Sequence, residues 1–173
     1  MSSIIEENKE ANNDFIPDYI INNWEDSKLD LKDKLLRAIY AHGFEKPSSI
    51  QQKAVYPMTK SLYDSKYGVR PRDIIAQAQS GTGKTGAFTV STLQIVDETQ
   101  KNVQALILAP THELARQIHS VIEALSIYLK INTVCAVGGI PVDVNKKEIL
   151  DKKPQIVVGT PGRIHDIIKR KIL

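Results

Sequence analysis

Residues 78–85 read Ala-Gln-Ser-Gly-Thr-Gly-Lys-Thr and follow a short apolar run. A buried strand that leads into a glycine loop ending in Lys-Thr, with a helix after it, is typical of a triphosphate-binding loop. Gly81 and Gly83 let the backbone curl so that its N–H groups point at phosphate oxygens. Lys84 supplies a charge for the β- and γ-phosphates, the Thr85 hydroxyl can bind Mg²⁺, and the helix N-terminus favours the same anion.

The same loop also permits a different nucleotide class. Gly81, Gly83 and Gly86 spell G-x-G-x-x-G, the dinucleotide fingerprint, and Ala78 stands where the phosphate-loop pattern has glycine. Lys84 and Thr85 would crowd a pyrophosphate lying close over the helix, so we favour the triphosphate interpretation. A dinucleotide-dependent reductase stays as the weaker alternative.

Length and composition indicate one globular domain. The chain has 173 residues, of which 42% are hydrophobic and 25% charged, which is enough to bury a core. No apolar stretch approaches the ~18–20 residues that cross a bilayer, and the N-terminus lacks a signal pattern. Cys135 is the single cysteine, and the four histidines show no metal-ligand spacing. We therefore expect a cytoplasmic protein without a membrane partner or a metal held by histidine and cysteine.

Charge is unevenly distributed along the chain. Residues 1–23 carry five acidic side chains against one lysine and few apolar anchors, so we expect an acidic, disordered tail there and a domain over residues 24–173. The whole chain carries +3, so the remainder carries +7. Eight basic residues lie between Lys146 and Leu173, a density that fits a nucleic-acid surface or simply a solvated face.

The hydrophobic pattern predicts an α/β fold. Two helices are expected first, from Leu31 to His42 and from Ser48 or Ser49 through Val55, followed by a surface loop at residues 61–72. Strand and helix then alternate, which predicts a mainly parallel sheet between two helical layers. The expected strands are 73–78, 104–109, 132–137 and 155–159, and the expected helices are 84–98, 112–128, 142–150 and 163–173.

Each glycine- or proline-rich break follows a predicted strand. Because ligands gather at the carboxyl ends of strands in open parallel sheets, we expect all of these breaks to lie along one edge of the sheet, the edge formed by the carboxyl ends of its strands. These breaks are Ser80–Thr85, Pro110–Thr111, Gly138–Gly139 and Thr160–Arg163.

Their order and spacing resemble the first domain of DEAD-box RNA helicases over about residues 24–173, most closely the translation initiation factor 4A branch. Gly43–Gln51 resembles the Q motif, Ala78–Thr85 motif I, Pro110–Gln117 motif Ia, Gly138–Gly139 the double-glycine element and Thr160–Arg163 motif Ib. The resemblance implies a RecA-like three-layer αβα domain, here ending before the Asp-Glu-Ala-Asp segment.

The resemblance also implies roles for individual residues. ATP and Mg²⁺ would be the cofactors, with Gln51 reading adenine, Phe44 stacking on it, and Lys84 and Thr85 serving catalysis and, for Thr85, the metal. The expected nucleotide-binding residues are Phe44, Lys46, Gln51, Ser80, Gly81, Thr82, Gly83, Lys84 and Thr85. Those expected to hold single-stranded RNA by its backbone are Pro110, Thr111, Gly138, Gly139, Thr160, Pro161, Gly162 and Arg163.

Two positions depart from the family pattern. His112 stands where motif Ia has arginine, so a charge contact there would be weak or pH-dependent. The family's isolated aromatic residue aligns near Asp26, two residues from Trp24, and whether Trp24 replaces it stays open. Asp97 and Glu98 imitate an acidic motif, but Asp97 lies only 13 residues after Lys84, at the end of the predicted helix, so we do not expect a metal site there.

Two functions follow from this pattern. The first is the ATP- and RNA-binding domain of an ATP-dependent RNA helicase that works with a second RecA-like domain, absent here, and a scaffold protein of the initiation-factor 4G type. Without its acidic motif and second domain the fragment is expected to be nearly inactive. It should also expose a sheet edge that pairs with another chain. The second function is a non-catalytic interaction fragment that binds RNA or a scaffold.

Overall fold

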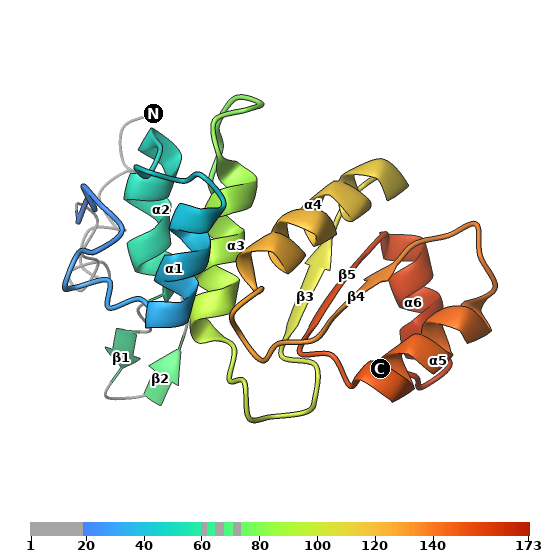
Figure 1. Ribbon diagram of the computed structural model, residues 1–173. Helices are drawn as coiled ribbons and strands as arrows, with labels where there is room; N and C mark the ends of the chain where they lie inside the picture. Colours follow the sequence, from blue (N-terminus) through green and yellow to red (C-terminus); the bar gives the residue numbers. More distant parts are fainter. Residues whose placement is uncertain (1–18, 60–61, 65–67, 71–73) are drawn as a thin grey trace, which may run out of the picture.

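The computed structural model describes residues 19–59, 62–64, 68–70 and 74–173, and its centre is a parallel sheet (Figure 1). The strands are β3 (Ala105–Leu108), β4 (Thr133–Ala136) and β5 (Ile156–Gly159), in the order β3-β5-β4. Leu108 and Ala136 both lie opposite Gly159, so the three strands end level with one another. The loops that follow them therefore share one edge of the sheet, as predicted.

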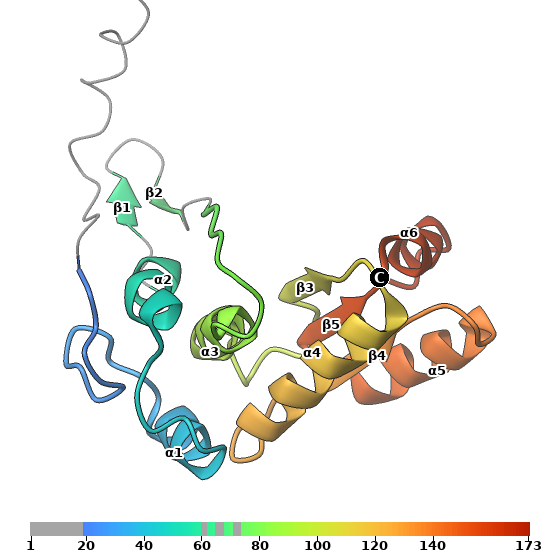
Figure 2. The same ribbon diagram turned by 90° about the horizontal axis from the view of Figure 1, so that it is seen from above.

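Helices cover both faces of this sheet. Alternate residues of β5 belong to different cores: Ile156 and Val158 pack with α4 (His112–Leu125), whereas Val157 packs with α5 (Val142–Lys152) and α6 (Pro161–Lys169). This alternation is the two-residue period of a strand buried on both sides. Figure 2 shows α4 and α6 on opposite sides of the strands. The predicted αβα layering is confirmed.

Three helices form the N-terminal half. They are α1 (Asp33–Ala41), α2 (Ser49–Thr59) and α3 (Lys84–Ile95), and α3 lies between α2 and the sheet (Figure 2). Pro57 lies inside α2 without ending it. The six helices of the described residues begin close to their predicted starts, and the main differences are at their ends: α3, α4 and α6 each stop three or four residues early.

The segment before the phosphate loop departs from the prediction. Residues 74–78, which we expected to form a strand, have no strand partner in the described part of the chain, and Ile75 is fully exposed. A β-strand needs a neighbour for its N–H and C=O groups, and among the described strands β3, at the side of the sheet, pairs with β5 alone. Asp73 lies outside the described residues. The expected loop at 61–72 instead contains a short antiparallel hairpin, β1 (Leu62–Asp64) and β2 (Gly68–Arg70).

Residues 19–32 pack against the helices. The Ile21 N–H donates to the Gln52 carbonyl of α2 at 3.1 Å, and the Ile21 and Trp24 side chains are buried. Of the expected tail, residues 1–18 lie outside the described part of the chain. Among the residues that are described, no helix is long and apolar enough to pass through a lipid bilayer.

Candidate nucleotide- and RNA-binding site

The phosphate loop leads directly into α3. Gly81 and Gly83 have φ values of +78° and +99°, a region that glycine adopts without strain. Gly83 is the N-terminal cap of α3 and no side chain caps the helix, so the N–H groups of its first turn are left for another acceptor. Unsatisfied amides at a helix start are the groups that hold phosphate in other proteins. The loop therefore has the backbone geometry that the sequence predicted.

Lys84 folds back onto this loop. Its Nζ donates to the carbonyls of Ala78 and Gln79, the latter at 2.6 Å, and the Thr82 hydroxyl donates to the same Gln79 carbonyl at 2.8 Å. The ammonium group therefore sits beside the curled backbone, where its charge adds to that of the free amides. A triphosphate has to exchange these carbonyls for its own oxygens to bind Lys84.

The end of α1 positions Phe44. The Gly43 N–H donates to Tyr40 and the Phe44 N–H to Ile39, at 3.0 and 3.1 Å, and Gly43 has φ +88°. These two bonds form a Schellman motif, which turns the chain sharply out of the helix. Phe44 consequently lies beside α3, where a Cβ added at Gly86 would be 2.9 Å from Cε2 of its ring.

Gln51 bridges the Q-motif segment and the phosphate loop. It is 3% exposed; its Oε1 accepts from the Ser48 N–H at 2.7 Å and its Nε2 donates to the Gly83 carbonyl at 3.1 Å. A Cβ at Gly83 would lie 2.6 Å from the Ser48 Oγ and 2.8 Å from the Gln51 Nε2, so only glycine fits there. The side chain expected to read the base therefore also supports the loop that holds the phosphates.

A hollow of about 400 Å³ lies between these two segments. Phe44, Lys46 and Gln51, three of the predicted nucleotide-binding residues, line it together with the phosphate-loop residues Gly81, Thr82 and Gly83. Sequence reasoning placed Ser48 at a possible helix start within the Q-motif segment but not among the nucleotide-binding residues, although Ser48 also lines this hollow. Its position three residues before Gln51, the spacing of one helical turn, was the available signal.

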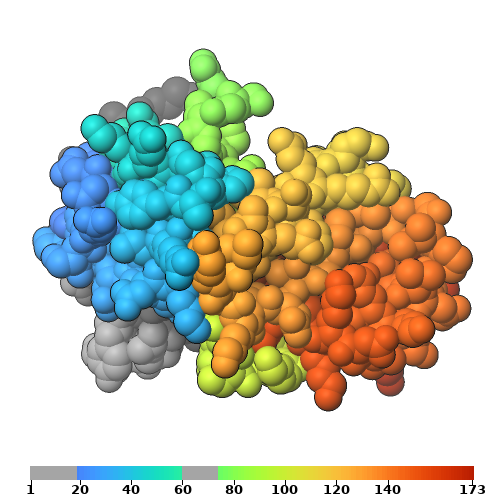
Figure 3. Space-filling view, viewed as in Figure 1, coloured from blue at the N-terminus to red at the C-terminus, as the bar shows by residue number. Residues whose placement is uncertain are grey.

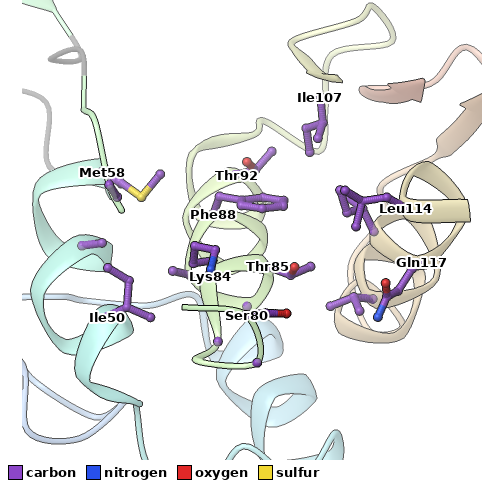
Figure 4. Close-up of a pocket in the computed structure, with 18 of the residues that line it drawn as sticks. Ile50, Met58, Ser80, Lys84, Thr85, Phe88, Thr92, Ile107, Leu114 and Gln117 are labelled. Atoms are coloured by element: carbon purple, nitrogen blue, oxygen red, sulfur yellow. The ribbon is translucent and has the colours of Figure 1, made fainter. Parts of the chain in front are cut away.

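A second, larger hollow separates α3 from the sheet. It has a volume of about 900 Å³, and in the space-filling view a notch lies between the loop before α3 and α4 (Figure 3). Figure 4 shows Thr85 and Phe88 on the side of α3 that faces Leu114 and Gln117 of α4. Ser80, Lys84 and Thr85 reach this hollow, and among the described residues no aspartate or glutamate lines it. Thr85, the residue predicted to bind the metal, thus lines this hollow beside the phosphate loop.

The edge formed by the strand ends collects the predicted RNA-binding residues. Thr111 caps α4, its hydroxyl accepting from the Leu114 N–H at 3.2 Å, and Pro110 beside it is exposed. Gly138 lies against the His112 ring, since a Cβ there would be 3.0 Å from the His112 Nε2. The first turn of α4 and the double-glycine turn are therefore in contact.

The motif Ib residues lie at the start of α6. Pro161 and Gly162 are exposed, whereas Thr160 is 8% exposed and its N–H donates to the Ala136 carbonyl at 3.2 Å. Arg163 is half-buried and donates to two protein acceptors, the Asn145 side chain and the Ile140 carbonyl. The structure thus brings all eight predicted RNA-binding residues to one edge, with Pro110, Thr111, Gly139, Pro161 and Gly162 the most accessible of them.

Two residues considered from the sequence lie elsewhere. Trp24 is 1% exposed within the N-terminal core, so its ring is not available for stacking on a base. Asp97 follows the end of α3, as predicted, and its carboxylate accepts from the Thr99 side chain and backbone. These bonds lower the pKa of Asp97 below its usual range.

A parallel αβα sandwich with a phosphate loop at the start of a helix defines a P-loop nucleotide-binding domain. The family model described as DEAD/DEAH box helicase matches residues 48–173. The chain belongs to this family.

Relatives and solved structures agree with that assignment. The ATP-dependent RNA helicase eIF4A of Chaetomium globosum is 50% identical over 145 residues, covering 84% of this chain and 34% of that protein. Eukaryotic initiation factor 4A of Drosophila melanogaster is 47% identical over 154 residues, covering 89% and 35%. The chain therefore spans about a third of the length of the curated relatives it matches.

Two solved structures have the same fold. Saccharomyces cerevisiae Dbp5 bound to RNA and ADP BeF3 has a TM-score of 0.72 and 34% identity, covering 88% of this chain and 35% of that one. A DEAD box protein from the hyperthermophile Methanococcus jannaschii has a TM-score of 0.72 and 36% identity, covering 89% and 39%. The predicted RecA-like fold is confirmed.

Proposed function

We propose that this chain is the ATP- and RNA-binding domain of an ATP-dependent RNA helicase that acts in translation initiation. In the full-length protein, hydrolysis of ATP would be coupled to local strand separation, with a second RecA-like domain closing over the nucleotide. The names of the eIF4A relatives support the activity and the process.

The observation that carries this proposal is the contact between Gln51 and the phosphate loop. Gln51, Phe44 and the loop residues surround one hollow, so a single ligand can touch the base-reading and phosphate-binding groups together. The Gln51 amide keeps one N–H and one lone pair beyond its two protein bonds, which matches the N7 and N6 groups of adenine. Guanine presents an acceptor where adenine has its amino group and would leave a buried group unpaired.

RNA binding is the second half of the proposal. The starts of α4 and α6, where a helix leaves backbone N–H groups without an intrahelical partner, and the turn at Gly138 and Gly139 lie along one edge of the sheet. Such groups bind phosphate and sugar without reading sequence. The RNA bound to the Dbp5 neighbour supports this role.

Nucleotide titration tests the ATP site. With a fluorescent ATP analogue, Lys84→Ala should weaken binding at least about tenfold, since a charge-assisted contact is worth about 1.5–3 kcal/mol. Lys53→Ala, which removes an exposed lysine from α2, is the matched control and should bind as wild type does. Gln51→Ala should reduce the preference for ATP over GTP. Equal wild-type affinity for the two nucleotides would refute the adenine-reading role.

A second candidate function is a non-catalytic module that binds RNA or a scaffold of the initiation-factor 4G type. The observation in its favour is that no acidic side chain from the described part of the chain lines the hollow around Thr85. Hydrolysis needs positioned water and stabilisation of the transferring phosphoryl group, so this chain alone should release phosphate at a negligible rate even with RNA present. Phosphate release that RNA accelerates would instead favour a catalytic fragment. Pull-down with the scaffold's helicase-binding region tests the partner.

A further inference from the structure

Arg163 connects three parts of the edge that would face RNA. It projects from the first turn of α6, its Nη1 donates to the Asn145 Oδ1 at 2.5 Å, and its Nη2 donates to the Ile140 carbonyl at 2.6 Å. Asn145 belongs to α5, and Ile140 directly follows the two glycines. One guanidinium therefore links α6, α5 and the double-glycine turn.

Asn145 can bind Arg163 but cannot contact a ligand outside the protein. It is completely buried on a helix whose other faces are largely exposed, so its amide cannot reach a nucleic acid. Its Nδ2 has no hydrogen-bond partner in the described part of the chain. Burying an amide whose N–H groups have no partner costs stability. The bond that the Asn145 Oδ1 accepts from Arg163 offsets part of that cost.

The turn that Arg163 holds needs external support. Gly139 has φ +86°, and a Cβ built at Gly138 would meet the His112 ring. Glycines have the largest backbone freedom, so ordering this turn is entropically unfavourable. The bond to Ile140 fixes the turn on the α6 side, as His112 does on the α4 side.

From these contacts we propose that Arg163 and Asn145 are positioning residues that preorganise the double-glycine turn for the RNA backbone. Both terminal nitrogens of Arg163 donate to protein acceptors, which holds the guanidinium against the turn, and we therefore assign Arg163 to positioning the turn. A phosphate contact through the remaining N–H groups is the alternative that the substitutions below test. Asn145 acts one step further away, by holding the guanidinium. The inference rests on the proposed RNA-binding function and specifies how that edge is built.

Two substitutions of Asn145 separate this role from a direct phosphate contact. Asn145→Leu keeps the size of the side chain but cannot accept from Arg163. If Arg163 positions the turn, RNA affinity should fall about 5- to 30-fold with an unchanged salt dependence, because no phosphate contact is lost. Asn145→Asp strengthens the bond to Arg163 and should retain wild-type affinity within about twofold.

A direct phosphate contact predicts the opposite pattern. Asn145→Leu would then free Arg163 and leave affinity equal or higher. Asn145→Asp would hold Arg163 more tightly, weaken binding, and reduce the slope of log affinity against log salt by about one. That pattern overturns the proposal.

The experiment uses fluorescence anisotropy of a labelled oligouridine, titrated between about 50 and 200 mM KCl. ATP-analogue affinity, whose site lies on α3, must stay at the wild-type value and reports a folded domain. Amide hydrogen exchange at residues 138–140 gives a readout without RNA: it should accelerate in Asn145→Leu and not in Asn145→Asp. Unchanged exchange in Asn145→Leu overturns the proposal. Wild-type protein that binds no RNA refutes the proposed function, while the exchange result still decides whether Arg163 fixes the turn.

Discussion

The Gln51 amide gives the sharpest test of the nucleotide site, through the substitution Gln51→Glu. The two side chains have the same shape, and the carboxylate can still accept from the Ser48 N–H. It cannot donate to the Gly83 carbonyl, so two acceptors would face each other where the structure has a bond of 3.1 Å. The substitution therefore replaces one hydrogen bond by a contact between two acceptors, and at neutral pH it also places a carboxylate at a buried position.

The size of the effect follows from burial. A hydrogen bond contributes about 0.5–1.5 kcal/mol, and leaving its buried partner unsatisfied costs about 1–3 kcal/mol. Because Gln51 is 3% exposed, both costs apply, and we expect a loss of about 2–4 kcal/mol in the free energy of unfolding at neutral pH. In a domain of this size that corresponds to a melting temperature lower by about 4–16 °C.

The loss should depend on pH. Burial raises the pKa of the introduced carboxyl above that of a carboxyl in the unfolded chain. A protonated carboxyl can donate to the Gly83 carbonyl, so stability is regained below the unfolded-state pKa and lost as pH rises through the folded-state pKa. The gap between wild type and Gln51→Glu should therefore narrow as pH is lowered towards about 5.

Urea denaturation followed by circular dichroism measures the gap at each pH. The control is Gln52→Glu, which makes the same chemical change one position along α2, at a half-buried side chain that makes no hydrogen bond in the described part of the chain. That variant should stay within about 0.5 kcal/mol of wild type. If both variants lose the same stability, or if the gap is constant with pH, the bond from Gln51 to Gly83 does not hold the loop.

Three further predictions concern the scaffold. Lys32→Met removes bonds from Nζ to the Leu93 and Val96 carbonyls at the end of α3, and should cost about 1–3 kcal/mol in urea denaturation, whereas Lys34→Met on the exposed face of α1 should be nearly neutral. Burial lowers the Lys32 pKa, so the unfolded chain binds more protons than the folded chain below pH 10.5. The stability of wild type relative to Lys32→Met should therefore increase as pH rises towards 10.5, and melting curves that show no such increase would contradict this. The Thr99 bonds lower the Asp97 pKa. The free energy of unfolding of wild type should therefore exceed that of Asp97→Asn above about pH 4, and the difference should disappear as pH falls through the lowered pKa. A difference that persists in acid would argue against those bonds. Leu108, 53% exposed on the open edge of β3, should promote self-association, so light scattering should find less dimer for Leu108→Lys than for wild type.

Much of this architecture could be predicted because local sequence signals agree with the fold. The β3, β4 and β5 strands are apolar runs bounded by turn residues, and Gly43, with its positive φ, follows α1 directly after the His42 end that the pattern predicted. Glycines and prolines marked the loops at the strand ends. Once the strands were known to be parallel, topology alone placed those loops together.

What could not be predicted depends on pairing partners distant in the sequence. Residues 74–78 have the apolar pattern of a strand, yet the pattern does not show whether a neighbouring strand is present to pair with them. The bonds of Arg163 to Asn145 and Ile140 are equally invisible, because an asparagine in a polar helix looks exposed until the helix is packed. The site residues themselves were predicted from their order along the chain, and their roles stay predictions until ligands are bound.

Segments that precede α3 in the sequence form hydrogen bonds with both of its ends. Gln51 of α2 holds its first residues and Lys32 holds its last carbonyls, while residues 19–32 are themselves attached to α2. A chain shortened to begin at residue 33 would thus lose the Lys32 bonds to the carbonyls at the C-terminal end of α3. The edge proposed for RNA, built from β3 to α6, would keep its own contacts, so we expect the shortened protein to lose affinity at the proposed ATP site before it loses affinity at the proposed RNA-binding edge.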